Sequence, residues 1–141
     1  MSITNDQTDA ARPRPPPVLT ADNEFFWRGC AEGRLLCRQC ADCGRLQHPP
    51  TPICPNCHGE RWELTELSGH GTVASYIVIH HPPNPWFELP MVAATIALEE
   101  GIELISNVED VAPADMALGM AVEVFFAPTE DDLAVPLFRP R

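Results

Sequence analysis

Two Cys-x-x-Cys motifs, only ten residues apart, constrain this chain more than any other feature of its sequence. The first motif contains Cys40 and Cys43, and the second contains Cys54 and Cys57. Four thiolates held in two tight turns suit a structural zinc ion, which prefers soft sulfur ligands in a closed tetrahedron. The spacing therefore predicts a zinc ribbon at residues 37–60, a stronger interpretation than four unrelated reduced cysteines.

Two further cysteines complicate the choice of zinc ligands. Cys37 precedes Cys40 at the same spacing, so these two residues form a competing motif. We favour Cys40 and Cys43 because Gly44 follows them, and glycine easily adopts the positive backbone angle that such a turn needs. Cys37 closes the apolar run Leu35-Leu36-Cys37 and is interpreted as a strand residue. Cys30 has Arg28 nearby but no clear base, so it is interpreted as a small buried or half-buried hydrophobic residue rather than as a nucleophile.

The charge balance restricts the class of partner. The 141 residues include 20 acidic and 9 basic side chains, every basic one is arginine, and the net charge is −11. A protein that binds nucleic acid needs a basic surface to neutralise phosphates, so this balance argues against the function that a zinc ribbon first suggests. Four arginines near the ribbon would either meet a phosphate or an acidic partner, or simply be solvated: Arg34, Arg38, Arg45 and Arg61.

Nothing in the sequence indicates a membrane or secreted protein. It lacks a run of about 20 apolar residues, the length that spans a bilayer. Its N-terminus lacks the basic and then apolar pattern of a signal peptide. Cysteines in metal-like spacing also suit a reducing compartment better than a disulfide framework does. We therefore expect a cytoplasmic protein.

The first part of the chain changes character at Thr20. Residues 1–19 are rich in proline, lack apolar periodicity, and are predicted to form a disordered tail. Thr20 or Asp22 can cap a helix that covers residues 21–31, and the glycine that follows is a natural stop. This helix and the ribbon together are expected to form a unit over residues 20–60.

Two groups of aromatic residues are candidate partner contacts. Successive helical residues project about 100° apart, so the three adjacent aromatics of the helix cannot share one face. The loop at residues 80–90 contains four prolines and two more aromatics, which either form a contact surface or fold back to cap the barrel. The predicted interface residues are Phe25, Phe26, Trp27, Trp86 and Phe87.

The remaining sequence has the pattern of short β-strands. One strand, at 34–38, leads into the first cysteine motif, and residues 46–52 are expected to be a stiff connection. Apolar or alternating runs bounded by turn residues predict six more strands: 62–67, 72–80, 91–98, 102–108, 121–127 and 135–138. Residues 112–118 are expected to plug a barrel end. The predicted fold is thus mainly β, with an N-terminal helix, a rubredoxin-like zinc ribbon, and a five- or six-stranded OB-type barrel over residues 61–141.

Short motifs follow one another in a fixed order along the chain. They are the helix with Phe25-Phe26-Trp27, then Cys40-x-x-Cys43-Gly44, Pro49-Pro50, Cys54-Pro55-x-Cys57, Gly69-x-Gly71-Thr72-Val73, Glu99-Glu100-Gly101, Gly119-x-x-Val122 and Pro136-Leu137-Phe138. In their order and spacing these motifs resemble a family of acyl-CoA-associated zinc-ribbon and OB-fold proteins known as domain of unknown function thirty-five. The resemblance runs from about residue 20 to the end of the chain, and Pro90-Met91 stands where the family commonly has Pro-Tyr.

The resemblance implies a non-catalytic accessory subunit with a structural zinc ion. Family members resemble obligate partners of thiolases, acyltransferases, steroid side-chain aldolases and enoyl-CoA hydratases. For this chain it implies a thiolase-fold aldolase or thiolase as partner, two plus two subunits, and an acyl-CoA substrate from steroid or lipid degradation. The barrel is expected to help form the channel for coenzyme A, while the ribbon and first helix dock on the partner.

The residues themselves indicate no independent enzyme. A closed four-thiolate zinc site leaves no position for a catalytic water. Adjacent strand residues point to opposite faces, so at most one of His80 and His81 could reach a thioester, and both are interpreted as surface or capping residues. Glu99 and Glu100 are interpreted as solvated turn charges. We therefore expect no turnover by the chain alone.

Two other functions remain as alternatives. An OB barrel with Trp86 and Phe87 for base stacking suits a protein that binds single-stranded nucleic acid, although the acidity argues against it. Electron transfer by an iron-thiolate site is the second alternative, because the cysteine motifs resemble those of rubredoxin. The short gap between the motifs, and His58 in the place of a glycine after Cys57, favour zinc over iron.

Overall fold

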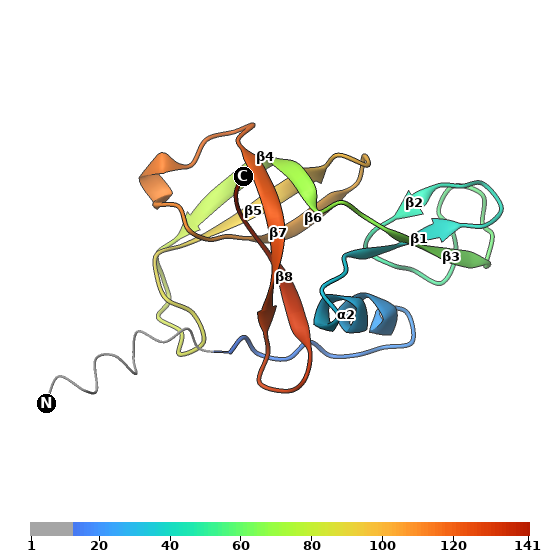
Figure 1. Ribbon diagram of the computed structural model, residues 1–141, viewed down its shortest axis with the longest axis horizontal. Helices are drawn as coiled ribbons and strands as arrows, with labels where there is room; N and C mark the ends of the chain where they lie inside the picture. Colours follow the sequence, from blue (N-terminus) through green and yellow to red (C-terminus); the bar gives the residue numbers. More distant parts are fainter. Residues whose placement is uncertain (1–12) are drawn as a thin grey trace, which may run out of the picture.

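The computed structural model describes residues 13–141, in which one α-helix lies beside a small ribbon sheet and a β-barrel. Figure 1 shows the ribbon sheet at one end of the molecule and the barrel at the other. The mainly β fold with an N-terminal helix, a zinc ribbon and an OB-type barrel is thus confirmed. Within residues 13–141, no helix is long and apolar enough to cross a membrane.

The ribbon sheet is built on the strand that carries the first cysteine. Its strand order is β2-β1-β3, with β1 (Leu36–Cys40), β2 (Leu46–Gln47) and β3 (Trp62–Glu66). Both neighbours run antiparallel to β1. The sequence placed β3 in the barrel and β2 inside a stiff connection, because two- and five-residue strands show too little alternation to reveal their partners. The predicted boundary between the two units, at residues 60 and 61, stays a prediction. β3 lies after this boundary in the sequence but pairs with β1 of the ribbon.

The barrel closes with five strands in the order β4-β5-β6-β8-β7, and β7 pairs back to β4. All five were predicted to within two residues at either end: β4 (His70–Ile79), β5 (Met91–Leu98), β6 (Glu103–Val108), β7 (Ala121–Pro128) and β8 (Ala134–Pro140). In β5 every second residue is buried, which is the two-residue period of a strand with one face on a core. Closure is tight at Gly71, where a Cβ atom would lie 2.6 Å from the carbonyl oxygen of Ala97.

One continuous apolar core joins the barrel to the helix. The largest fully buried side chains of the barrel are Phe138, Ile96, Val73, Val108 and Val122. Phe26 and Cys30 of the helix belong to the same cluster. The predicted plug at residues 112–118 contains the short 3-10 helix η1 (Pro113–Asp115), and Met116 just after it is buried in this core.

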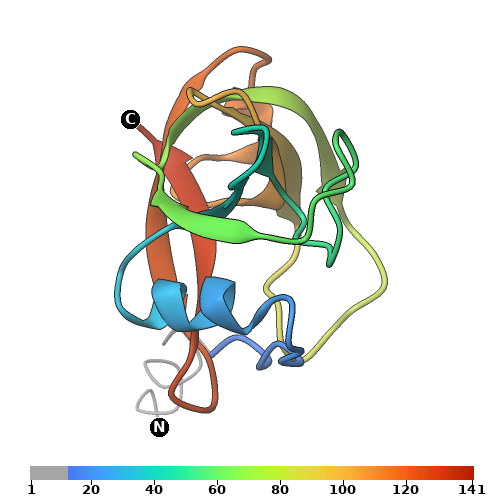
Figure 2. The same ribbon diagram turned by 90° about the vertical axis from the view of Figure 1, so that its right-hand side faces the viewer.

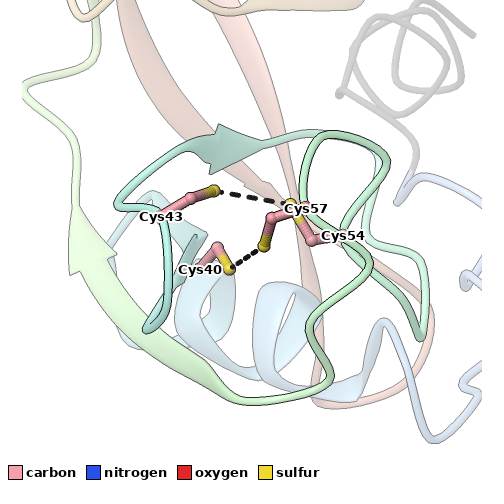
Figure 3. Close-up of side chains that lie close together, drawn as sticks. All are labelled: Cys40, Cys43, Cys54 and Cys57. Carbon is pink, nitrogen blue, oxygen red and sulfur yellow. Dashed lines mark hydrogen bonds between the residues drawn. The ribbon is translucent and has the colours of Figure 1, made fainter.

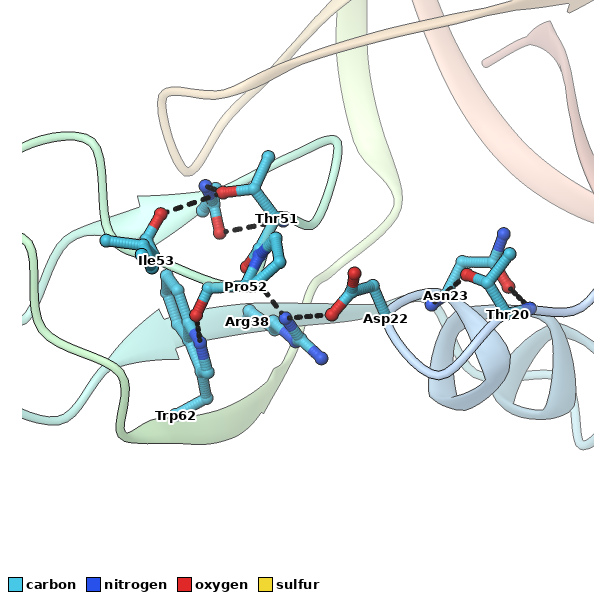
Figure 4. A network of polar contacts seen from close by, with 9 residues as sticks. Thr20, Asp22, Asn23, Arg38, Thr51, Pro52, Ile53 and Trp62 are labelled. Carbon is cyan, nitrogen blue, oxygen red and sulfur yellow. Dashed lines mark hydrogen bonds and ion pairs between the residues drawn. The ribbon is translucent and has the colours of Figure 1, made fainter.

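The helix α2 (Glu24–Ala31) begins three residues later than the sequence predicted. Residues 20–23 form a turn in which the backbone N–H of Thr20 donates to Asn23 Oδ1 at 2.7 Å and the N–H of Asn23 donates to Thr20 Oγ1 at 3.2 Å (Figure 4). Such side-chain bonds compete with helical backbone bonds and delay the first turn. Figure 2 shows α2 lying across β8, on the side of the barrel that faces the ribbon.

The predicted disordered tail divides into two parts. Residues 1–12 lie outside the described residues, so that part of the prediction is unchanged. Residues 13–19 run along the barrel: the N–H of Arg14 donates to the carbonyl oxygen of Pro128 at 3.1 Å, and the N–H of Glu130 donates to the carbonyl of Arg14 at 3.1 Å. The composition of this segment gave no signal for these contacts, because they depend on a hairpin more than 100 residues away.

Candidate functional site

The four predicted ligand cysteines converge between the two turns of the ribbon (Figure 3). Their sulfur atoms all lie within 4.8 Å of one another. The Sγ–Sγ distance is 3.5 Å between Cys40 and Cys57, and 3.7 Å between Cys43 and Cys54. These distances are far too long for a disulfide, whose S–S bond is about 2.0 Å. All four cysteines are free thiols.

The two cysteine turns have the same backbone hydrogen bonds. In the first, the N–H of Gly44 donates to the carbonyl of Cys40 at 2.8 Å; in the second, the N–H of His58 donates to the carbonyl of Cys54 at 2.8 Å. The first cysteine of each turn also donates its N–H to a carbonyl two residues beyond the second cysteine. Gly44 has φ +79° and His58 has φ +64°, so both turns need a left-handed residue at this position.

A tetrahedral zinc ion fits these four sulfur atoms. A Zn–S distance of about 2.3 Å places the sulfurs of a regular site about 3.8 Å apart, close to both Sγ–Sγ distances that the turns set. A hydrogen bond with the Asn56 side chain is the main cause that lowers the pKa of Cys43 to about 6, whereas the pKa of Cys57, beside the other three sulfur atoms, is raised to about 12. A metal requires all four cysteines as thiolates, so its binding releases protons. Cys40 and Cys54 are buried and Cys43 and Cys57 are exposed. When bound, zinc would cross-link the two turns.

A polar and aromatic network joins this centre to the helix (Figure 4). The guanidinium of Arg38 donates to the carbonyl of Thr51 at 2.8 Å and lies 3.5 Å from the carboxylate of Asp22. Its charged group also lies over the rings of Phe25 and Trp62, at 5.3 and 5.4 Å from the ring centres. The network fixes the connection between the two cysteine turns against the start of α2.

Of the four arginines near the ribbon, three pair with acidic residues, whereas the exposed Arg45 has no ion pair within residues 13–141. Arg34 pairs with Glu66 at 2.9 Å, Arg61 pairs with Asp42, and Arg38 pairs with Asp22. Each of these cations has an acidic neighbour in the same chain, which leaves little positive potential for a phosphate. Arg45 is thus a single unpaired cation and does not by itself make the basic patch that a phosphate-binding surface needs.

Cys30 is buried and Cys37 lies in strand β1, as predicted, and Cys37 is buried as well. Burial raises the pKa of the Cys30 thiol to about 12, and burial is also the main cause that raises the pKa of Cys37. The Cys37 sulfur lies 3.2 Å from the carbonyl oxygen of Gln47. Because the thiolate is the nucleophilic form, neither residue is suited to attack a substrate.

The predicted interface aromatics lie in three different environments. Phe26 is only 4% exposed and packs in the core, so it cannot offer its ring to a partner without movement. Trp27 meets Phe26 edge to face at 4.8 Å between ring centres. Phe25, Trp86 and Phe87 are half-buried, and Arg14 lies over the Phe87 ring at 5.1 Å. The loop with Trp86 and Phe87 therefore meets the N-terminal segment, a contact that the sequence did not suggest.

A groove of about 890 Å³ lies between the helix and the barrel. Phe26 and Trp27 form one wall, residues of β6 and β8 form the other, and Phe87 and Arg14 lie at the rim. Arg14 is fixed there by bonds of 2.9 Å to Asn107 Oδ1 and to Glu109 Oε1. The groove brings two of the predicted interface groups to one place, which their distance in sequence had not indicated.

Glu100 differs from the predicted solvated turn charge. Its carboxylate accepts a hydrogen bond of 2.8 Å from the backbone N–H of Ser68, the residue that connects the ribbon to the barrel. Glu99 is exposed, as expected for a turn residue. Glu100 thus helps to hold the ribbon exit against the β5–β6 turn.

Comparisons with known proteins agree with this architecture. Residues 27–63 match a family model described as the rubredoxin-like zinc ribbon domain of ChsH2, and residues 64–127 match the C-terminal OB-fold domain of ChsH2. The chain is 41% identical over 137 residues to a "Probable enoyl-CoA hydratase alpha subunit" of Thermomonospora curvata. This alignment covers 97% of the chain and 42% of that protein.

A second relative is the "3-oxo-4,17-pregnadiene-20-carboxyl-CoA hydratase alpha subunit" of Mycobacterium tuberculosis, 34% identical over 110 residues, or 78% of the chain and 35% of that protein. The chain thus spans about two fifths of the length of these two curated relatives. A solved structure described as an Ltp2-ChsH2(DUF35) aldolase aligns with a TM-score of 0.85 at 41% identity, over 89% of the chain and 98% of the matching chain. The protein belongs to the DUF35 family of zinc-ribbon and OB-fold proteins.

Proposed function

We propose that this chain is a non-catalytic accessory subunit that binds a thiolase-fold aldolase or thiolase and supports its action on acyl-CoA thioesters. The observation that carries the proposal is the match over 98% of a ChsH2 chain in an aldolase complex with Ltp2. The curated relatives support the same substrate class, because both are named as α subunits of acyl-CoA hydratases. The second relative acts on a pregnadiene carboxyl-CoA, which supports a steroid among the possible acyl groups.

The site chemistry supports a structural role for this chain. The metal centre offers four cysteines to one ion, and such a closed site holds a fold together instead of activating water. The two remaining thiols are buried with raised pKa values and are poor nucleophiles. The chemistry of the complex is therefore assigned to the partner subunit, and an assembly of two plus two subunits is part of the proposal.

The proposed docking surface consists of the half-buried aromatics on α2 and on the loop before β5. Phe25, Trp27, Trp86 and Phe87 are the contacts we propose, and Phe26 is left out because it fills the core. Half-buried tryptophan and phenylalanine side chains are typical of interface centres, where their large rings lose water on binding.

Capture from the native host tests the proposal. The tagged chain is purified at moderate salt, its stoichiometric protein companions are identified by mass spectrometry, and nucleic acid in the eluate is measured by its absorbance. We expect a thiolase-fold protein whose cleavage of acyl-CoA, assayed alone and with this chain, rises when the chain is added. Recovery of nucleic acid, or of the chain alone, would contradict the proposal.

A matched pair of variants separates docking from folding. Trp86→Ala removes a half-buried ring from the proposed contact surface, while Leu118→Ala removes a side chain that is 68% exposed near the 3-10 helix. We expect the first variant to lose capture of the partner and the second to retain it, with equal zinc content in both. Equal capture by both variants would remove Trp86 from the interface.

A further inference from the structure

The barrel is incompletely paired on the side that faces the groove. β6 is paired with β5 along residues 103–108, whereas its parallel pairing with β8 is confined to Val108 and Phe138. Over the described chain, residues 103–107 therefore have a strand neighbour on one side only. Pro136 in the facing part of β8 has no N–H to donate, and its carbonyl oxygen already accepts a bond of 2.7 Å from Ser106 Oγ. The two strands therefore cannot complete an ordinary ladder here.

The backbone groups of alternate β6 residues point toward this gap. In an antiparallel pair, the residues of one strand direct their N–H and C=O groups alternately to the two sides. The N–H of Leu98 donates to the carbonyl of Ile102, which directs the even-numbered residues of β6 toward β5. The N–H of Glu109 donates to Phe138 on β8, which directs the odd-numbered residues the other way. Ile105 thus presents both its N–H and its C=O to the gap, while Asn107 presents only its N–H, because the parallel bridge between Val108 and Phe138 uses the Asn107 carbonyl.

The surroundings of this edge match an amide-rich occupant. Ile105 lines the groove and is 77% exposed. On the opposite wall the indole Nε1 of Trp27 is buried, and in residues 13–141 it has no hydrogen-bond partner. A buried donor without an acceptor is costly, so a carbonyl group from an incoming molecule would relieve it. An extended peptide supplies N–H groups, carbonyl groups and side chains for both walls at once.

We propose that the free edge of β6 receives an extended, basic segment of the partner subunit as an added strand. The inference rests on the proposed function and names the groove as one part of the docking surface. The stretch from Glu103 to the N–H of Asn107 is about 14 Å long, enough for a short β-addition, and the groove holds about 890 Å³. The segment lies between β6 and the helix wall, where a rotation of the buried Trp27 indole would bring its Nε1 to a carbonyl of the segment.

Charge decides which occupant fits. The chain has a net charge of −11, and Glu103 at the start of this edge has no ion-pair partner in the described part of the chain. A lysine or arginine in the incoming strand would pair with Glu103 and reduce the negative potential. A second copy of this acidic chain would instead add like charge at the contact, so edge-to-edge self-association is disfavoured.

A proline substitution tests the edge without breaking the ladder to β5. Ile105→Pro removes an N–H that faces the groove, and Ile105→Thr is the matched control that keeps both the N–H and the branched side chain. With the captured partner subunit, we expect the proline variant to bind about tenfold more weakly and the threonine variant to bind nearly as the wild type does. Zinc content and thermal unfolding of both variants establish that they fold.

Photo-crosslinking gives an answer that does not depend on the proline variant. A benzoyl-phenylalanine is placed at Ile105 in the complex, and the attached peptide is mapped by mass spectrometry. We expect one contiguous partner segment with a lysine or arginine, and a synthetic peptide of that segment should compete with the partner for binding. Glu103→Gln should weaken the peptide at low salt and have a smaller effect at high salt.

Several results would overturn the inference. These are crosslinks to a second copy of this chain, competition by pantetheine but not by the partner peptide, or equal partner affinity of the proline and threonine variants. If no thiolase-fold partner is captured at all, the proposed function fails first. If the partner is captured and the edge variants bind equally, the proposed function stands and only the added strand is wrong.

Discussion

The ribbon and the barrel are stabilised in different ways within one short chain. The ribbon has strands of five, two and five residues, and Leu64 on its sheet is 55% exposed. The barrel has five longer strands around side chains such as Phe138 and Ile96, which are fully buried. A segment as small as the ribbon cannot bury enough apolar surface to fold alone, so a metal ion must supply the missing free energy. The barrel needs no such cross-link.

Loss of a zinc ligand should produce the largest effect, and it should be confined to the ribbon. Structural zinc contributes an apparent ~10–16 kcal/mol in small zinc domains. In Cys54→Ser we expect loss of zinc and of amide-exchange protection in β1 and β3, while the barrel strands stay protected. Zinc is measured by mass spectrometry and protection by hydrogen exchange. Cys37→Ser is the control, because a serine there can keep the contact with Gln47; loss of zinc from both variants would contradict the ligand assignment.

A cavity in the barrel should destabilise the barrel and leave the ribbon with its zinc ion. Phe138 is fully buried, and truncation of such a ring costs about 3–5 kcal/mol. We expect Phe138→Ala to lower the free energy of unfolding of the barrel by this amount, measured by urea denaturation, while zinc remains bound at denaturant concentrations that unfold the barrel. If zinc is released at the same midpoint, the two regions unfold as one unit and the comparison fails.

The two cysteine turns offer a finer test within the ribbon. His58 has φ +64° where the other turn has Gly44, and a left-handed residue other than glycine costs about 1 kcal/mol. We expect His58→Gly to increase zinc affinity up to about fivefold and Gly44→Ala to decrease it by a similar factor. Competition with a chromophoric chelator measures both. A lower zinc affinity in His58→Gly would show that side-chain contacts of His58 outweigh its backbone strain.

The smallest expected effect concerns pH and the contact between ribbon and helix. Burial lowers the pKa of His48, whose ring lies 5.1 Å from that of Phe26. Because the folded state binds the proton less readily, stability is retained above the unfolded pKa of about 6.5 and is lost as the pH falls below it. In His48→Gln we expect a smaller loss of unfolding free energy between pH 7 and pH 5, measured by denaturation. Equal losses in variant and wild type would show that His48 does not contribute.

The sequence predicted the elements whose signal is local. The spacing of the cysteines indicated the metal centre, and the alternation in β5 indicated a strand with the observed ends, Met91 and Leu98. It gave no signal where a partner is distant in sequence. β3 was assigned to the barrel although its register is set by β1, and Phe26 was assigned to an interface although the barrel core covers it. Arg14 was placed in a disordered tail because nothing near it signals Asn107 or Glu109.

By itself the sequence determined the metal chemistry, the mainly β fold and the order of its parts, because ligand spacing and strand periodicity are properties of neighbouring residues. Only the tertiary structure decided which aromatic rings are available for contact and where the groove lies. It alone showed that β6 keeps an open edge, since that depends on how β8 approaches after the barrel closes. Proline at position 136 was visible in the sequence, but the part of β6 that it leaves without a second strand neighbour was not.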